Sequence, residues 1–94
     1  MRIEFDPEKA RRTFEQRGLD FRDAAHVFAG EQFTFQDLRK DYGEPRFITI
    51  GYLDGRLVVV GWTPRERGRE TVRRVYSMRK ASEKEIARFE ERLR

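Results

Sequence analysis

The sequence predicts an α+β domain in which two N-terminal helices precede an antiparallel sheet meander and a C-terminal helix closes the chain. Its 94 residues suffice for one modest core, so one domain over residues 1–94 is expected. A proline-led helix start at Asp6-Pro7 and a helix cap at Ser82 frame the chain. Between them, Asp54-Gly55 separates two strand-like runs, which favours a β-hairpin.

The first helix is expected over residues 7–17. Asp6 is a suitable N-cap, and Pro7 fits the first helical position because no backbone N–H is needed there. Gly18 then supplies a C-terminal stop.

A second helix and a short strand follow. Asp20 can cap a helix that runs to about Phe28 and ends at Gly30. Beyond it, Phe33 and Phe35 alternate with polar residues, and this period of two predicts a short strand.

The hairpin around Asp54-Gly55 is the strongest local signal. Asp-Gly favours a two-residue type I′ turn, which here joins residues 46–53 to residues 56–63. If Leu53 opposes Arg56, the register of the whole hairpin follows, and Phe47 faces Trp62. Apolar residues then lie on both faces, so we expect central strands that are covered on both sides.

A third strand is expected over about residues 71–79, antiparallel to the second and joined to it by a charged loop at residues 64–70. Strict alternation places Arg73 and Arg79 on one face and Arg74 on the other. Ser82 with Glu85 then forms a capping box that starts the closing helix.

Composition limits the chemistry. The absence of cysteine excludes disulfides, thiolate zinc sites and a cysteine nucleophile, and one histidine without paired carboxylates argues against a metal site. The scattered glycines form no phosphate-binding loop, so we expect no cofactor. Without a long apolar run or a leader segment, a soluble cytoplasmic protein with no membrane partner is expected.

Positive charge is concentrated in one segment. The formal net charge is +4, and residues 64–80 carry seven basic side chains against two acidic ones. Six of the seven are arginines, whose planar forks hold phosphate oxygens with two hydrogen bonds. An anion site is therefore favoured, although a solvated charged surface remains an alternative.

Such a set of residues can support RNA cleavage without a metal, in which the ribose 2′-OH attacks the neighbouring phosphate. Arg46, Arg65 and Arg79 are candidates to neutralise the phosphate, and Arg46 and Arg65 should lie at one end of the sheet while Arg79 lies toward the other. The candidates for proton transfer are Glu44, Tyr76, Lys80 and Asp41. Arg73, Arg74, Lys80, Trp62 and Tyr76 are candidates for RNA binding, the aromatic rings by stacking on bases or, alternatively, by serving only as sheet packing.

The order and spacing of short motifs along nearly the whole chain resemble the BrnT family. The matching segments are Phe5-Asp6-Pro7 with Lys9-Ala10, Gly18, Phe21, Ala24-Ala25, Val27-Phe28, Tyr42-Gly43-Glu44-Pro45-Arg46, Ile50-Gly51, Asp54-Gly55-Arg56, Thr63 with Arg65, and Ser77-Met78-Arg79-Lys80-Ala81 with Glu85. The resemblance implies a toxin of a type II toxin–antitoxin pair, with a RelE-like fold and a metal-independent ribonuclease activity that inhibits translation. It also implies a BrnA-like antitoxin with a DNA-binding domain, so that operator DNA is bound only through the complex.

The polar positions that match the family are Lys9, Glu44, Arg46, Arg65, Ser77 and Arg79. The resemblance favours the three arginines as catalytic charge-stabilising groups and Glu44 as a proton-transfer group. Two departures stand out: family members usually have Lys-His-Gly where this chain has Gln16-Arg17-Gly18, and a small residue where it has Met78. Because a guanidinium stays charged, Arg17 cannot replace a histidine in proton transfer.

Two other functions therefore remain open. The chain could be a catalytically degenerate toxin homologue that binds the antitoxin as a co-repressor module, or a plain nucleic-acid-binding protein. Toxicity in the absence of antitoxin separates the first from a nuclease, and salt-sensitive binding without RNA products identifies the second.

Overall fold

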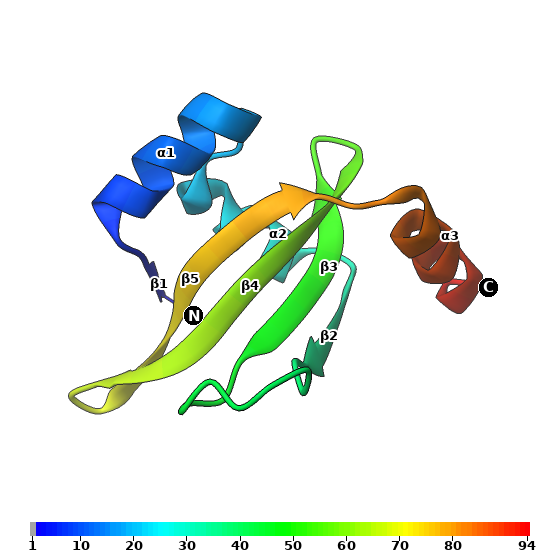
Figure 1. Ribbon diagram of the computed structural model, residues 1–94. Coiled ribbons are helices and arrows are strands. Elements are labelled where there is room, and N and C mark those ends of the chain that lie inside the picture. Colours follow the sequence, from blue (N-terminus) through cyan, green and yellow to red (C-terminus); the bar gives the residue numbers. More distant parts are fainter. Residues whose placement is uncertain (1) are drawn as a thin grey trace.

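The computed structural model describes residues 2–94 and contains a five-stranded mixed sheet in the order β1-β5-β4-β3-β2 (Figure 1). Along the chain the elements are β1 (Ile3–Glu4), α1 (Pro7–Arg17), the 3-10 helix η1 (Phe21–Asp23), α2 (Ala24–Ala29), β2 (Gln32–Gln36), β3 (Phe47–Leu53), β4 (Arg56–Arg67), β5 (Glu70–Lys80) and α3 (Glu83–Arg92). Within the described residues, every helix is too short or too polar to span a membrane.

The predicted first helix is confirmed as α1. The Asp6 side chain accepts a hydrogen bond from the N–H of Glu8, and Gly18 ends the helix with a φ of 70°, a left-handed conformation that glycine adopts without strain. The second helix begins differently from the prediction. Asp20 does act as a cap, but the first turn is the 3-10 helix η1, and the α-helix covers only Ala24–Ala29.

The predicted hairpin register is confirmed over β3 and β4, from Leu53 opposite Arg56 to Phe47 opposite Trp62. The predicted strand around Phe33 and Phe35 is confirmed as β2, which pairs antiparallel with β3. The expectation of a purely antiparallel sheet is wrong, because β1 adds to β5 in parallel. A two-residue strand is too short to show periodicity, so this pairing has no local signal.

The predicted charged loop at residues 64–70 is also wrong. β4 continues to Arg67 and β5 begins at Glu70, so Gly68 and Arg69 alone form the turn. The extension is supported by polar contacts at its end: Thr71 Oγ1 donates to Glu66 Oε1 at 2.8 Å, and Arg67 Nε donates to Glu4 Oε2 at 3.0 Å. Charged residues here pair across strands instead of forming a loop.

A bulge interrupts β5 at Tyr76. Gly61 opposes Ser77 and the next residue, Trp62, opposes Val75, so Tyr76 has no residue opposite it on β4. The alternation of side chains therefore changes at this point. Arg79 lies on the same face as Arg74 rather than on the face of Arg73, which corrects the strict alternation expected from the sequence.

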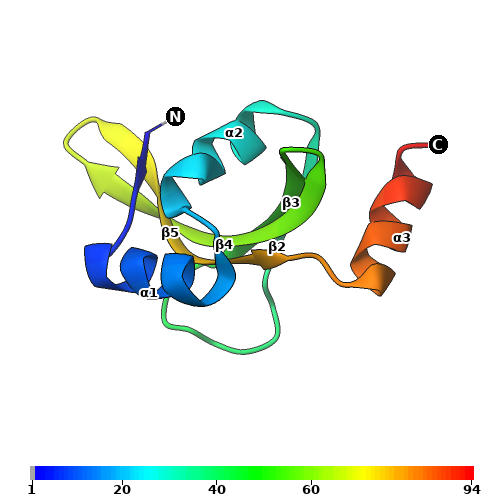
Figure 2. The ribbon, with the colours of Figure 1, turned by 90° about the horizontal axis from the view of Figure 1, so that it is seen from above.

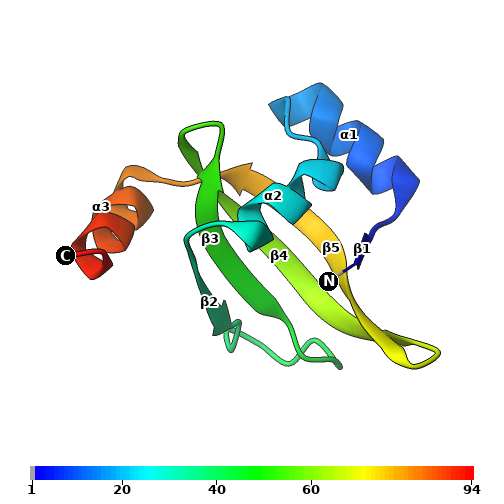
Figure 3. The same cartoon turned by 180° about the vertical axis from the view of Figure 1, so that it is seen from behind.

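The main core lies between the sheet and the segment formed by η1 and α2, which crosses the back of β3 and β4 (Figure 3). Phe21, Val27, Val60 and Met78 are completely buried there. The other face is covered more lightly. Viewed from above, α3 stands at the far end of the molecule from α1 (Figure 2), and its buried Phe89 contacts the rings of Phe33 and Tyr52.

Candidate functional site

A charged cleft of about 290 Å³ lies where the start of β3 meets β4, β5 and α1. The loop before β3 contributes a carboxylate and an arginine, the strands contribute two further arginines and a tyrosine, and α1 contributes a lysine and an arginine. Its charged and aromatic residues are Asp6, Lys9, Arg12, Glu44, Arg46, Arg65, Arg74 and Tyr76.

The hairpin register brings these residues together. Arg46 precedes Phe47, which pairs with Trp62, so Arg46 lies beside Thr63, two residues before Arg65. The hydroxyl of Thr63 donates to the carbonyl of Pro45 at 2.6 Å and fixes the end of the loop against β4. The predicted proximity of Arg46 and Arg65 is therefore confirmed.

Glu44 is the central anion of the cleft. Its carboxylate lies 3.0 Å from Nη2 of Arg65 and 3.9 Å from Nε of Arg46. The Nε atoms of both arginines are buried and have no hydrogen-bond acceptor within residues 2–94. Five cationic side chains against two carboxylates give the cleft a formal charge of +3, which suits it to bind a phosphate group.

The guanidinium of Arg46 contacts two tyrosine rings. Its Cζ atom lies 4.3 Å from the ring centroid of Tyr42 and 4.4 Å from that of Tyr76. Burial raises the pKa of Tyr76, so its hydroxyl remains a proton donor at neutral pH. The sequence assigned no role to Tyr42, because a tyrosine in a loop has no periodic signal. Tyr42 entered the sequence analysis only as the first residue of a segment that resembles the family.

Arg79 lies outside this cleft. It lines a neighbouring cleft of about 410 Å³ with Phe35, Ile48 and Glu85, on the same face of the sheet. Its guanidinium donates two hydrogen bonds to the Glu85 carboxylate, at 2.7 and 2.9 Å. The expected separation of Arg79 from the other two arginines is confirmed, and the ion pair occupies the atoms that would hold a phosphate.

Two candidates for RNA binding lie on the opposite face. Trp62 is 8% exposed, its Nε1 donates to Thr49 Oγ1 at 2.9 Å, and its ring stacks on Phe47. Arg73 lies over the same ring, with its Cζ atom 4.5 Å from the centroid. The structure thus places both residues in the packing against α2, whereas Arg74 lines the charged cleft.

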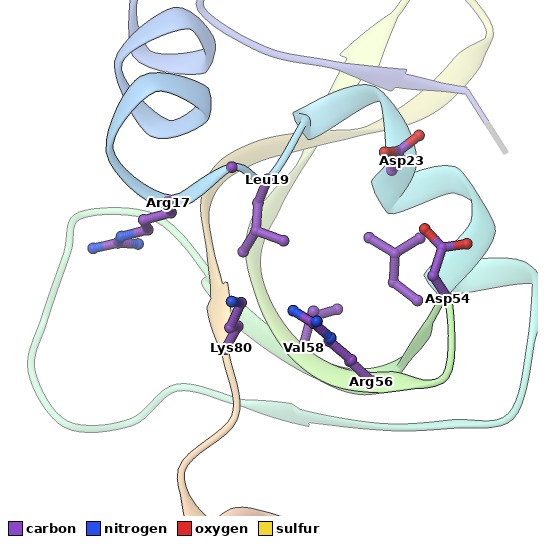
Figure 4. A pocket seen from close by; sticks show the side chains of 9 residues that line it. Arg17, Leu19, Asp23, Asp54, Arg56, Val58 and Lys80 are labelled. Carbon is purple, nitrogen blue, oxygen red and sulfur yellow. The ribbon is translucent and has the colours of Figure 1, made fainter.

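Lys80 lines a third cleft, of about 490 Å³, at the turn between β3 and β4. Figure 4 shows Arg17 and Lys80 on one side of this cleft, Asp23 and Asp54 on the other, and Arg56 between them. Arg17 Nη1 donates to the carbonyl of Met78 at 2.8 Å, so the two positions that depart from the family pattern contact each other. Glu44 and the three candidate catalytic arginines do not line this cleft, so Lys80 is separated from them.

The remaining polar candidates divide between the cleft and the surface. Lys9 lines the charged cleft, with its ammonium 5.8 Å from the Tyr76 ring centroid, and Ser77 lies opposite Gly61. Asp41 is exposed and accepts the N–H of Gly43 at 2.9 Å, as in a loop turn. Residues 2–94 contain no group of three or more histidine or acidic side chains placed to hold a metal ion.

Comparison with known proteins supplies the family. A search of curated proteins finds no match. The family model for "Ribonuclease toxin, BrnT, of type II toxin-antitoxin system" matches residues 5–85 and so includes the loop, the strands and the first turn of α3 that form the two clefts. The chain belongs to the BrnT family of ribonuclease toxins of type II toxin–antitoxin systems.

Proposed function

We propose that this chain cleaves RNA without a metal ion, using the cleft formed by Glu44, Arg46, Arg65 and Tyr76. The observation that carries the proposal is the position of Glu44 beside two guanidinium groups in a cleft with a net charge of +3. A carboxylate can accept a proton, and the adjacent guanidinium groups stabilise the negative charge that develops on the reacting phosphate.

In this reaction the ribose 2′-OH attacks the neighbouring phosphorus. The new bond between the 2′ oxygen and phosphorus forms as the bond to the 5′ oxygen breaks, leaving a 2′,3′-cyclic phosphate and a 5′-hydroxyl. Glu44 accepts the 2′-OH proton, and the protonated hydroxyl of Tyr76 gives a proton to the leaving 5′ oxygen. Exchange with water restores both groups.

The other arginines take supporting roles in this proposal. Arg74 lines the cleft and is 35% exposed, so it can contact the RNA backbone. Arg79 faces the neighbouring cleft and is assigned to a phosphate beyond the scissile one, which it binds in exchange for its ion pair with Glu85. Trp62 and Arg73 take no part, because they pack on the opposite face.

RNA cleavage in excess chelator tests the proposal. Wild-type protein should produce fragments ending in a 2′,3′-cyclic phosphate, and intact RNA beside an active family member would overturn the nuclease assignment. Arg65→Ala should lower kcat about 100-fold, as the loss of one group that stabilises the transition state does. Arg56→Ala is the matched control, since Arg56 lies at the other end of the same strand, at the turn between β3 and β4, outside the cleft.

Membership of a type II toxin–antitoxin family also implies a protein antitoxin as partner. We propose that a BrnA-like protein with a DNA-binding domain neutralises this toxin in the cytoplasm, that the complex binds operator DNA, and that free toxin inhibits translation. Co-purification of the toxin with such a protein tests the partner. An operator-binding complex and no DNA binding by the toxin alone are the expected results.

A second function is favoured by the ion pair that occupies Arg79 and by the contact of Arg17 with Met78. In both contacts an arginine hydrogen-bonds within the protein and has fewer donors left for RNA. This is expected of a degenerate toxin that binds the antitoxin as a co-repressor module. Induced expression in a bacterial host without antitoxin separates the two. Growth arrest supports the nuclease, and normal growth with intact antitoxin binding supports the co-repressor module.

A further inference from the structure

Tyr42 lies in the loop that joins β2 to β3, and its ring faces the guanidinium of Arg46 at 4.3 Å. The Tyr76 ring contacts the same guanidinium at 4.4 Å. A cation within about 6 Å of an aromatic centroid is attracted to the ring face. Two such contacts restrict the long side chain of Arg46 to a narrow range of orientations.

The loop anchors Tyr42 through Asp37, which is only 7% exposed. The Tyr42 hydroxyl donates to Asp37 Oδ2 at 3.1 Å, while the backbone N–H of Asp37 donates to the carbonyl of Arg46 at 2.7 Å. Asp37 therefore links the ring of Tyr42 and the backbone of Arg46.

A second arginine keeps Asp37 in its ionised form. Arg39 donates to both oxygens of the Asp37 carboxylate, at 2.9 and 2.8 Å. These hydrogen bonds, with help from that of Tyr42, hold the pKa of Asp37 well below its usual range. The carboxylate thus remains an acceptor for Tyr42 at any pH at which the protein would act.

Arg46 differs from Arg65 in what holds it. Arg65 has a direct ion pair with Glu44 at 3.0 Å, whereas the contact of Arg46 Nε with Glu44 is 3.9 Å. The N–H groups of a guanidinium point outward in its plane, and aromatic rings contact its faces. Its Nε is buried, but the Arg46 side chain as a whole is 30% exposed. Rings can therefore orient Arg46 and leave the terminal N–H groups of its guanidinium available for a phosphate.

We infer that Tyr42 is a positioning residue that fixes the Arg46 guanidinium for the reacting phosphate, with Asp37 as its anchor. The inference rests on the proposed function, because it assigns Tyr42 a part in that reaction. The ring carries the effect, and the hydroxyl contributes only the tether to Asp37.

Kinetics on an RNA oligonucleotide that contains a mapped cleavage site tests the inference. Tyr42→Leu should lower kcat about tenfold and change KM less than about twofold, because the misplaced cation acts mainly on the transition state. Tyr42→Phe keeps the ring and should recover most of kcat. In an Arg46→Ala background, Tyr42→Leu should have no further effect, since the two residues act as a unit. Tyr52→Leu is the matched control, because the Tyr52 ring packs on Phe89 outside the cleft.

A second measurement does not depend on activity. The two rings should shift the proton resonances of the Arg46 Cδ group upfield, and Tyr42→Leu should move them downfield while Tyr42→Phe does not. A wild-type kcat and unchanged resonances in Tyr42→Leu would overturn the positioning role and leave the nuclease intact. Intact RNA with the wild-type protein would overturn the proposed function, and the resonances would still report whether Tyr42 orients Arg46.

Discussion

Arg79 on β5 and Glu85 in the first turn of α3 form a two-point ion pair, with Nη1 and Nη2 at 2.7 and 2.9 Å from the two carboxylate oxygens. Glu85 also accepts the backbone N–H of Ser82 at 2.8 Å and thereby completes the capping box of α3. One carboxylate thus both starts the last helix and fastens it to the sheet. This double use makes α3 sensitive to a single charge.

Removing the charge of Glu85 should weaken this attachment. The hydrogen bonds from Arg79 lower the pKa of Glu85 to about 2, against an ordinary 4.5. Because the folded-state pKa is depressed, the stabilisation is complete above about pH 4.5 and is lost as the pH falls toward 2. Glu85→Gln can keep the cap but loses the ion pair with Arg79. It should lower the free energy of unfolding by about 1 kcal/mol at neutral pH, and the effect is this small because the Arg79 side chain is 46% exposed.

Urea unfolding of the wild type and Glu85→Gln at several pH values measures the effect. The difference between the two proteins should disappear near pH 2. A constant difference across the whole range would show that the ion pair does not contribute.

A methyl group at Gly61 should disturb both the bulge and the cleft. A Cβ atom there would lie 2.5 Å from Ser77 Oγ and 2.7 Å from the Tyr76 ring. Gly61→Ala should therefore cost about 2 kcal/mol and lower RNA cleavage, because the Tyr76 ring must move away from Arg46. Thermal unfolding and kcat measure the two effects.

Gly30→Ala is the control for this substitution. Its φ is −103°, and the nearest atom to an added Cβ would lie 3.6 Å away, so stability should change by less than about 0.5 kcal/mol. Equal losses in the two variants would contradict the steric argument at Gly61.

Thr49 satisfies the indole N–H of Trp62 in the core. Thr49 is completely buried, and its Oγ1 accepts the Trp62 Nε1–H at 2.9 Å. Thr49→Val keeps the shape of the side chain but leaves that donor without a partner, so the free energy of unfolding should fall by about 2 kcal/mol. Urea unfolding monitored by tryptophan fluorescence measures this change. Thr34→Val removes the exposed hydroxyl that contacts Thr49 and should cost clearly less. An unchanged free energy of unfolding in Thr49→Val would show that the indole N–H finds another partner.

Arg73 and Arg74 are adjacent in sequence and lie on opposite faces of the sheet. If RNA occupies the charged cleft, Arg74→Ala should weaken RNA binding and reduce the slope of log affinity against log salt by about 0.7, the value for one phosphate contact on a single strand. Arg73→Ala should leave that slope unchanged. Salt titrations of binding to a non-cleavable, 2′-O-methylated RNA measure both variants. A reduced slope in Arg73→Ala together with an unchanged slope in Arg74→Ala would place the RNA on the other face.

Local signals in the sequence predicted most of the elements. Asp6-Pro7, Gly18 and the capping box at Ser82 are backbone requirements of helix ends, and Asp54-Gly55 is a requirement of a tight turn. Each depends on neighbouring residues only. The short parallel strand β1 and the bulge at Tyr76 depend on contacts with distant segments, so no local pattern predicted them.

The candidate site was predicted in part for the same reason. Arg46 and Arg65 meet because one hairpin turn fixes their register. The role of Tyr42 depends on its anchoring by Asp37 in a loop without periodicity. The pairing of Arg79 with Glu85 depends on where α3 returns to the sheet, which is set by the packing of Phe89 on Phe33 and Tyr52.

The amino-acid sequence by itself determined the helix ends, the hairpin register, the concentration of arginine and the resemblance to the BrnT family, because these properties reside in short segments. Only the tertiary structure decided which arginines share the charged cleft. One unpaired residue on β5 moves Arg79 to the face of Arg74, and packing of the main core keeps Arg73 on the other face. Where a side chain on this sheet points depends on contacts between strands that are far apart in the chain.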